Sequence, residues 1–125
     1  MKTVLYIDDN DEILDIVRLS MANSGYRVLT ENDSSKAVDR CIKELPELVL
    51  MDISMPGLNG FEITRNLRKA GFNKPVVVLT ASESEEDRKR AKAAGCTDYI
   101  LKTVDMRNVG AIVDHYIGEM GQLIS

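Results

Sequence analysis

The chain has 125 residues, a length that suits one domain built around one hydrophobic core. Its hydrophobic fraction of 44%, charged fraction of 29% and formal net charge of -4 are typical of a globular protein with an acidic surface. An acidic balance gives no support for DNA binding, which relies on basic side chains to neutralise phosphates. No apolar run approaches the roughly 20 residues of a membrane-spanning helix, and the first apolar run is too short for the core of a signal peptide. We therefore expect a cytoplasmic protein that neither binds DNA nor inserts into a membrane.

The first two predicted elements are a strand over Thr3 to Ile7 and a helix over Asp11 to Asn23. The strand is apolar and stops at Asp8. Asn10 or Asp11 offers a side-chain oxygen that can cap the helix. Several residues recur at helical spacing and so predict its buried face: Ile13, Ile16, Val17 and Ser20 or Met21.

A second strand is expected over Tyr26 to Thr30, and a second helix from Asp33, Ser34 or Ser35 to about Leu45. The face of this helix is predicted by Ala37, Val38, Cys41 and Ile42. The third strand, Glu47 to Asp52, ends in a carboxylate, and the turn-rich segment 55–60 follows it.

The second half of the chain repeats the same alternation. A helix with Phe61, Ile63 or Thr64, and Leu67 inward ends near Gly71, before an apolar strand over Pro75 to Thr80. A capping box at Ser84 opens the fourth helix, with Ala91 and Ala94 inward and Gly95 as its stop. The fifth strand covers Thr97 to Leu101. Asp105 can cap the last helix, whose apolar stripe is Val109, Ile112 or Val113, Tyr116 or Ile117, and Met120.

Strict alternation of strands and helices predicts parallel strands joined by right-handed crossovers. We expect a doubly wound α/β fold, (βα)5, with the flavodoxin-like strand order 2-1-3-4-5 and helices on both faces of the sheet. Residues 1–125 are expected to form a single domain without an output domain, because no further element follows the fifth helix.

Chemically active side chains follow the strands of this predicted sheet. Ligands of open parallel sheets bind beyond the carboxyl ends of the strands, so Asp8, Asp9 and Asp52 are expected in one crevice, with Thr80 and Lys102 beside them. Three carboxylates so close repel one another. A Mg²⁺ ion, or Mn²⁺, removes that repulsion because it prefers oxygen ligands, and Lys102 adds a second positive charge.

A characteristic set of features runs in order along the whole chain: the pair Asp8-Asp9, Asp52 at the end of the third strand, the turn Met55-Pro56-Gly57, Thr80-Ala81 after the fourth strand, Tyr99 in the fifth strand, and Lys102. In these features the chain resembles the response regulator receiver domains of two-component signalling, which have the fold of chemotaxis regulators. The resemblance implies a signalling switch, and no enzymatic activity beyond its own phosphorylation and dephosphorylation.

The resemblance also implies how the site residues act. Asp52 accepts a phosphoryl group from a histidine kinase or a histidine phosphotransfer protein. Asp9 binds Mg²⁺ directly, together with Asp52 and the backbone carbonyl of Ser54, whereas Asp8 acts mainly through a metal-bound water.

In relatives, the residues that match Lys102, Thr80 and Tyr99 change their contacts when the phosphoryl group is attached. The resemblance implies that Lys102 pairs with Asp52 and later with a phosphoryl oxygen. It also implies that the Thr80 hydroxyl turns inward to bond the phosphoryl group and that Tyr99 changes rotamer. Output then comes from a downstream protein that docks on the fourth helix, fifth strand and fifth helix. The domain is expected to be a monomer or a weak phosphorylation-dependent dimer.

The chain departs from its relatives at one position. Most of them have a proline after the lysine, often with a cis peptide bond, whereas Thr103 follows Lys102 here. A cis bond before a residue other than proline costs about 2.5 to 4 kcal/mol. We therefore expect either a trans bond with a rearranged loop from Lys102 to Asp105, or a strained cis bond held by its surroundings.

Other functions fit the sequence less well. A pseudo-receiver that docks without phosphate is the main alternative, and Thr103 is its only support. A phosphatase of the haloacid dehalogenase type needs an acid two residues after the nucleophile, where this chain has Ser54. A flavodoxin needs a hydroxyl- and glycine-rich phosphate loop, where this chain has Asp8-Asp9-Asn10. Taken singly, each acid could also be a helix cap or a turn residue.

Overall fold

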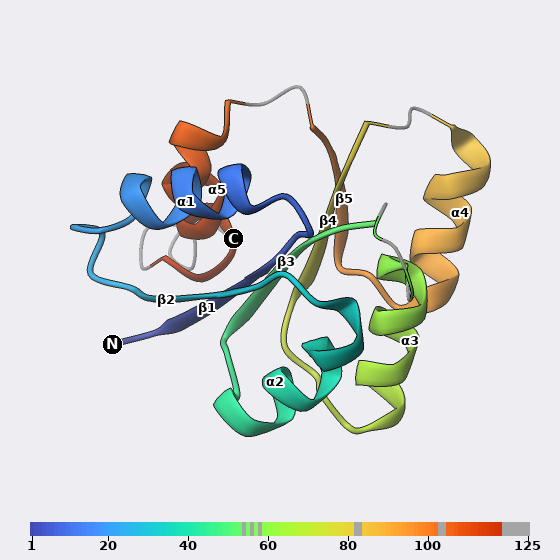
Figure 1. The fold of residues 1–125 in the computed structure, drawn as a ribbon. Helices are drawn as coiled ribbons and strands as arrows, with labels where there is room; N and C mark the ends of the chain where they lie inside the picture. Colours follow the sequence, from blue (N-terminus) through green and yellow to red (C-terminus); the bar gives the residue numbers. More distant parts are fainter. Residues whose placement is uncertain (54, 56, 58, 82–83, 103–104, 119–125) are drawn as a thin grey trace.

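A computed structural model shows a five-stranded sheet between two layers of helices (Figure 1). It describes residues 1–53, 55, 57, 59–81, 84–102 and 105–118. The strand order is β2-β1-β3-β4-β5, and every neighbouring pair is parallel. The predicted doubly wound α/β fold is confirmed, including its strand order.

Each predicted strand begins within one residue of its observed start. The strands are β1 (Thr3–Ile7), β2 (Arg27–Glu31), β3 (Leu48–Asp52), β4 (Val76–Thr80) and β5 (Asp98–Leu101). The helices are α1 (Asp11–Ser20), α2 (Ala37–Glu44), α3 (Gly60–Lys69), α4 (Glu85–Ala94) and α5 (Val109–Ile117), with short 3-10 turns at Ser34–Lys36 and Met106–Asn108. Among the described residues, none of these helices has the length and apolar character needed to span a bilayer.

The three central strands are buried along their whole length. Helices α1 and α5 cover one face of the sheet, and α2, α3 and α4 cover the other (Figure 1). Burial on both faces explains why β1, β3 and β4 are continuous apolar runs rather than alternating ones. The sheet is therefore a rigid base for any side chain at its carboxyl edge.

The predicted buried face of α1 was partly wrong. Leu14, Val17 and Met21 are buried, whereas Ile16 is 36% exposed and Ser20 is exposed. Leu14, Val17 and Met21 recur at helical spacing, and so do Ile13, Ile16 and Ser20. Periodicity alone therefore could not show which of these two stripes faces the core. Contact with the sheet and α5 selects the stripe that contains Leu14.

The other helices follow their predicted faces more closely. In α2, Ala37 and Cys41 are buried, but Ile42 is 45% exposed and was wrongly predicted to face inward. Helix α3 buries Phe61, Ile63, Thr64 and Leu67, and α5 buries Val109, Val113 and Ile117, as predicted. Met120 lies outside the described residues.

Helix α4 is attached to the sheet mainly through small side chains. Its buried residues are Ala91 and Ala94. The Ser84 hydroxyl caps its first turn by accepting from the backbone N–H of Asp87, at 3.3 Å, and Gly95 ends it with φ of +97°. Because two alanines bury little apolar surface, α4 is weakly attached to the sheet.

Candidate functional site

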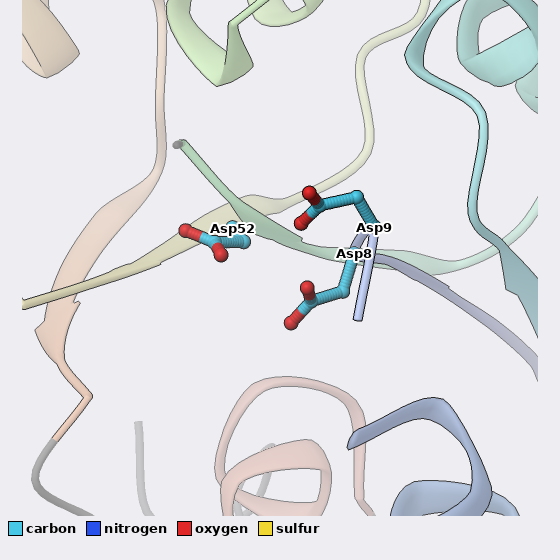
Figure 2. Close-up of side chains that lie close together, drawn as sticks. All are labelled: Asp8, Asp9 and Asp52. Atoms are coloured by element: carbon cyan, nitrogen blue, oxygen red, sulfur yellow. The ribbon is translucent and has the colours of Figure 1, made fainter. Parts of the chain in front are cut away.

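The carboxyl ends of β1 and β3 deliver three carboxylates to one place. Asp8 follows the last residue of β1, and Asp52 is the last residue of β3, with Ile7 and Met51 paired between the two strands. One carboxylate oxygen from each of Asp8, Asp9 and Asp52 lies within 4.8 Å of the other two. Figure 2 shows the three side chains lying close together at the ends of the two strands.

The turn after β1 explains why Asp8 is buried while its neighbour Asp9 is exposed. The backbone N–H of Asn10 donates to Asp8 Oδ1 at 3.0 Å, which closes a tight turn. The Asn10 side chain then accepts from the backbone N–H of Glu12 at 3.0 Å and caps α1. As a result Asp8 is fully buried and anchored, while Asp9 is exposed at the surface.

Lys102 bridges two of the carboxylates. Its Nζ lies 3.0 Å from Asp8 Oδ2 and 3.1 Å from Asp52 Oδ2. The backbone N–H of Lys102 donates to the carbonyl of Thr80 at 2.6 Å, which ties the lysine to the end of β4. Burial by itself lowers the pKa of Lys102, but hydrogen bonds and charges from Asp8 and Asp52 outweigh it and hold that pKa above its usual value. The sequence had predicted the pairing with Asp52 but not the one with Asp8.

A buried tyrosine, Tyr6, is hydrogen-bonded to Asp8. The hydroxyl of Tyr6 donates to Asp8 Oδ2 at 3.3 Å, and the whole residue is buried. Burial raises the pKa of Tyr6 far above its usual value, and the negative charges of Asp8 and Asp52 raise it further. Sequence reasoning missed this contact and treated Tyr6 as a core strand residue. Its spacing from Asp8 was a usable signal, because residues two apart in a strand share one face.

Thr80 and Tyr99, the predicted switch residues, lie at different positions along their strands. Thr80 is the last residue of β4, buried at the same edge of the sheet. Tyr99 lies further back, paired with Val78 in the middle of the β4–β5 ladder. Ser54, and with it the predicted carbonyl ligand, lies outside the described residues, as does the Lys102–Thr103 peptide bond.

The start of α3 packs directly against the chain that follows Asp52. The backbone N–H of Gly60 donates to the carbonyl of Ile53 at 3.2 Å. A Cβ at position 60 would lie 2.9 Å from Ile53 Cα and 3.2 Å from the carbonyl oxygen of Asp52. Only glycine permits this approach, so α3 supports the backbone on which Asp52 is mounted.

These residues fit a hard divalent cation. Three carboxylates and one ammonium leave a net negative charge in a partly buried space, and carboxylate oxygens are the preferred protein ligands of Mg²⁺. Mg²⁺ also keeps several waters in protein sites, so an ion here can bind some of these oxygens directly and reach others through water.

The family model described as "Response regulator receiver domain" matches residues 4–114. The chain belongs to this family. Receiver domains are signalling switches of two-component systems that receive phosphoryl groups from histidine kinases and act on downstream targets.

Individual relatives agree with this assignment. This receiver domain is 32% identical, over 112 residues, to the alkaline phosphatase synthesis transcriptional regulatory protein PhoP of Bacillus subtilis. That match covers 90% of this chain and 47% of PhoP, so the chain spans about half the length of this relative.

Solved structures show the same fold. The chemotaxis protein CheY4 of Vibrio cholerae superposes with a TM-score of 0.85 at 26% identity, over 94% of this chain and 99% of CheY4. The BeF3-activated N-terminal receiver domain of RstA from Klebsiella pneumoniae gives a TM-score of 0.81 at 27% identity, over 92% of this chain and 97% of that one. The resemblance to receiver domains predicted from the sequence is confirmed.

Proposed function

We propose that this receiver domain is a phosphorylatable switch that accepts a phosphoryl group on Asp52 from a histidine kinase or a histidine phosphotransfer protein. The observation that carries the proposal is the geometry of the acids: Asp52 shares one oxygen-lined space with Asp8 and Asp9 and is bonded by Lys102 at 3.1 Å. The Asp52 side chain is 12% exposed, so the carboxylate is sheltered by protein but open on one side to a donor.

The proposed reaction needs little covalent chemistry from the protein. An oxygen of the Asp52 carboxylate forms a bond to phosphorus, the bond from phosphorus to the donor histidine nitrogen breaks, and the electron pair stays on the imidazole. Such transfers depend mainly on alignment and on neutralising the phosphoryl oxygens. Bound Mg²⁺ supplies positive charge for those oxygens. In this proposal Asp9 and Asp52 hold the ion directly with the Ser54 carbonyl, and Asp8 holds it through water.

Lys102 and Thr80 act on the phosphoryl group in this proposal. Lys102 already donates to Asp52 Oδ2, so a short movement transfers its bond to a phosphoryl oxygen. The buried Thr80, whose carbonyl is tied to the Lys102 backbone at 2.6 Å, offers a hydroxyl at the same edge. Phosphorylation replaces the single negative charge of the carboxylate with a phosphoryl group that carries about −1.5 to −2, and these two donors respond to it.

The proposed switch then reaches the surface through Tyr99 and α4. The Tyr99 ring packs against the cluster that holds Ala91 and Ala94 of α4. The guanidinium of Arg88 lies over the ring, with its carbon 4.9 Å from the ring centroid. Movement of Tyr99 would change both contacts of the weakly attached α4, and hence the surface of α4, β5 and α5 on which we place a downstream protein.

The first prediction concerns the cation–π contact between Arg88 and the ring of Tyr99. An exposed cation–π contact contributes about 0.5–1 kcal/mol, so Arg88→Gln should shift the Tyr99 equilibrium about two- to fivefold toward the activated rotamer. The measurement is the amide NMR shift of Tyr99 during titration with beryllofluoride. The variant should reach its midpoint at a lower concentration than the wild type.

Helix α4 offers a matched control for this prediction. Arg90 lies over the ring of Phe61, also at 4.9 Å, on the α3 side of the helix. Arg90→Gln removes an equivalent contact without touching Tyr99 and should leave the midpoint unchanged. Equal midpoints for all three proteins would show that Arg88 does not restrain Tyr99.

The experiment that tests the proposed function is phosphorylation with and without metal. The protein is incubated with acetyl phosphate or a phosphorylated donor protein, and its intact mass is measured. One phosphoryl group per chain is expected with Mg²⁺ or Mn²⁺, and none after chelation with EDTA, because the uncompensated acids repel the phosphate. Absence of a phosphoryl adduct under both conditions would refute the proposal.

A further inference from the structure

We propose that Tyr6 is a positioning residue of the phosphorylation site. In this proposal, its hydroxyl holds the Asp8 carboxylate in place while Lys102 moves from the carboxylates to the phosphoryl group. The inference rests on the proposed function, and it assigns a role to a core residue whose hydroxyl bonds to Asp8.

The ring of Tyr6 is fixed by its surroundings. Tyr6 is fully buried in β1, within the core cluster that the central strands form with α1 and α5. Tyr6 and Asp8 are two residues apart and point to the same face of the sheet. A buried tyrosine needs a partner for its O–H, and this one donates to Asp8 Oδ2 at 3.3 Å. The hydroxyl therefore reaches Asp8 from the core side.

The carboxylate of Asp8 receives three donors. The backbone N–H of Asn10 donates to Oδ1, whereas Tyr6 and Lys102 both donate to Oδ2. An ionised carboxylate has about four acceptor positions, so about one remains. The remaining position can accept a hydrogen bond from a metal-bound water, which is the role proposed for Asp8.

The shared oxygen explains why the tyrosine matters. When Lys102 moves to a phosphoryl oxygen, the fully buried carboxylate of Asp8 loses its cation at Oδ2. A buried charged oxygen without a donor is costly. With Tyr6 present, the O–H stays on Oδ2, so the Asp8 carboxylate remains oriented. Without that hydroxyl, Asp8 Oδ2 would have no hydrogen-bond donor after Lys102 moves away. Phosphorylation would then be slower.

Tyr6→Phe tests this role, because it removes the hydroxyl and keeps the ring that fills the core. Initial rates of phosphorylation by acetyl phosphate are measured over a range of Mg²⁺ concentrations. The maximal rate should fall about three- to tenfold, because this hydrogen bond is long at 3.3 Å and contributes no more than an ordinary one. The Mg²⁺ concentration for half-maximal rate should stay within about twofold, because Tyr6 acts on the oxygen shared with Lys102.

A second tyrosine provides the matched control. Tyr26 donates its hydroxyl to Asp114 Oδ1 at 2.6 Å, outside the candidate site. Tyr26→Phe also removes one tyrosine–carboxylate hydrogen bond and should leave the phosphorylation rate unchanged. Equal rates for wild type and Tyr6→Phe would overturn the inference while the proposed function stood.

A double-mutant cycle asks whether Tyr6 acts through Asp8. In an Asp8→Asn background, adding Tyr6→Phe should have little further effect on the rate, because the carboxylate that the hydroxyl orients is gone. The same three- to tenfold loss in that background would overturn the inference. No phosphoryl adduct on the wild type would instead refute the proposed function, which is a different outcome.

The amide of Asn10 gives a readout that does not depend on the rate. Its N–H donates to Asp8 Oδ1 and so reports the position of that carboxylate. On addition of beryllofluoride with Mg²⁺, its NMR signal should move less in the wild type than in Tyr6→Phe. Equal movement in both proteins would show that Tyr6 does not hold Asp8.

Discussion

Asp52→Asn is expected to abolish incorporation of phosphate from acetyl phosphate or a phosphorylated donor protein. An amide nitrogen or oxygen at this position cannot form the acyl phosphate that the carboxylate forms. Stability should change by no more than about 1 kcal/mol, since a like charge leaves the acidic cluster while Lys102 keeps its contact with Asp8 at 3.0 Å. The measurements are the intact mass after incubation with Mg²⁺ and the free energy of unfolding in urea.

A surface aspartate serves as the control for this variant. Asp39 is exposed on α2, and Asp39→Asn should be phosphorylated at the wild-type rate. A phosphoryl adduct on Asp52→Asn equal to that on Asp39→Asn would place the acceptor elsewhere and refute the assignment of Asp52.

Lys102→Met is expected to lower the phosphorylation rate by about 10²-fold, the usual cost of removing one fixed donor from a developing charge. Methionine keeps most of the length of the side chain, so the change acts mainly through the lost ammonium. Two carboxylates lose their shared cation, and Asp8 is fully buried. The free energy of unfolding without metal should therefore fall by about 2 kcal/mol.

The metal dependence of stability separates this explanation from simple damage to the fold. If the loss arises from uncompensated acids, Mg²⁺ should bind Lys102→Met at least as tightly as the wild type, and should raise its free energy of unfolding by about 2.7 kcal/mol at 100 times the Kd, enough to offset the loss. Lys43→Met, at an exposed position on α2, is the control and should behave as the wild type. A rate for Lys102→Met within twofold of that control would exclude Lys102 from phosphoryl transfer.

Much of the candidate site was predictable because strands set its position. An apolar strand followed by an acid can be read directly from residues 3–8 and 48–52, and parallel topology brings such strand ends to one edge. The pairing of Ile7 with Met51 shows the result. The same argument places Thr80 and Lys102 at the ends of their strands without any knowledge of side-chain contacts.

The choice of partners at that edge was less predictable. The bond of Lys102 to Asp8 and the bond of Tyr6 to the same carboxylate oxygen both depend on side-chain directions and on how deeply each group is buried. Residue spacing indicates that Tyr6 and Asp8 share one face of the sheet, but it indicates nothing about Lys102 and Asp8. The place of Arg88 over the Tyr99 ring depends in the same way on where α4 lies against β5.

The amino-acid sequence by itself determined the alternation of strands and helices, the order of the acids along the chain and the caps that start and end several helices. These features depend on neighbouring residues and on rules of chain topology. Only the tertiary structure decided which stripe of α1 faces the core, with Leu14 inward and Ile16 outward, and which donors share the oxygens of Asp8. Those outcomes depend on contacts between residues as far apart as Asp8 and Lys102, because the free energy of packing and of burying a charge belongs to the assembled core and not to any one segment.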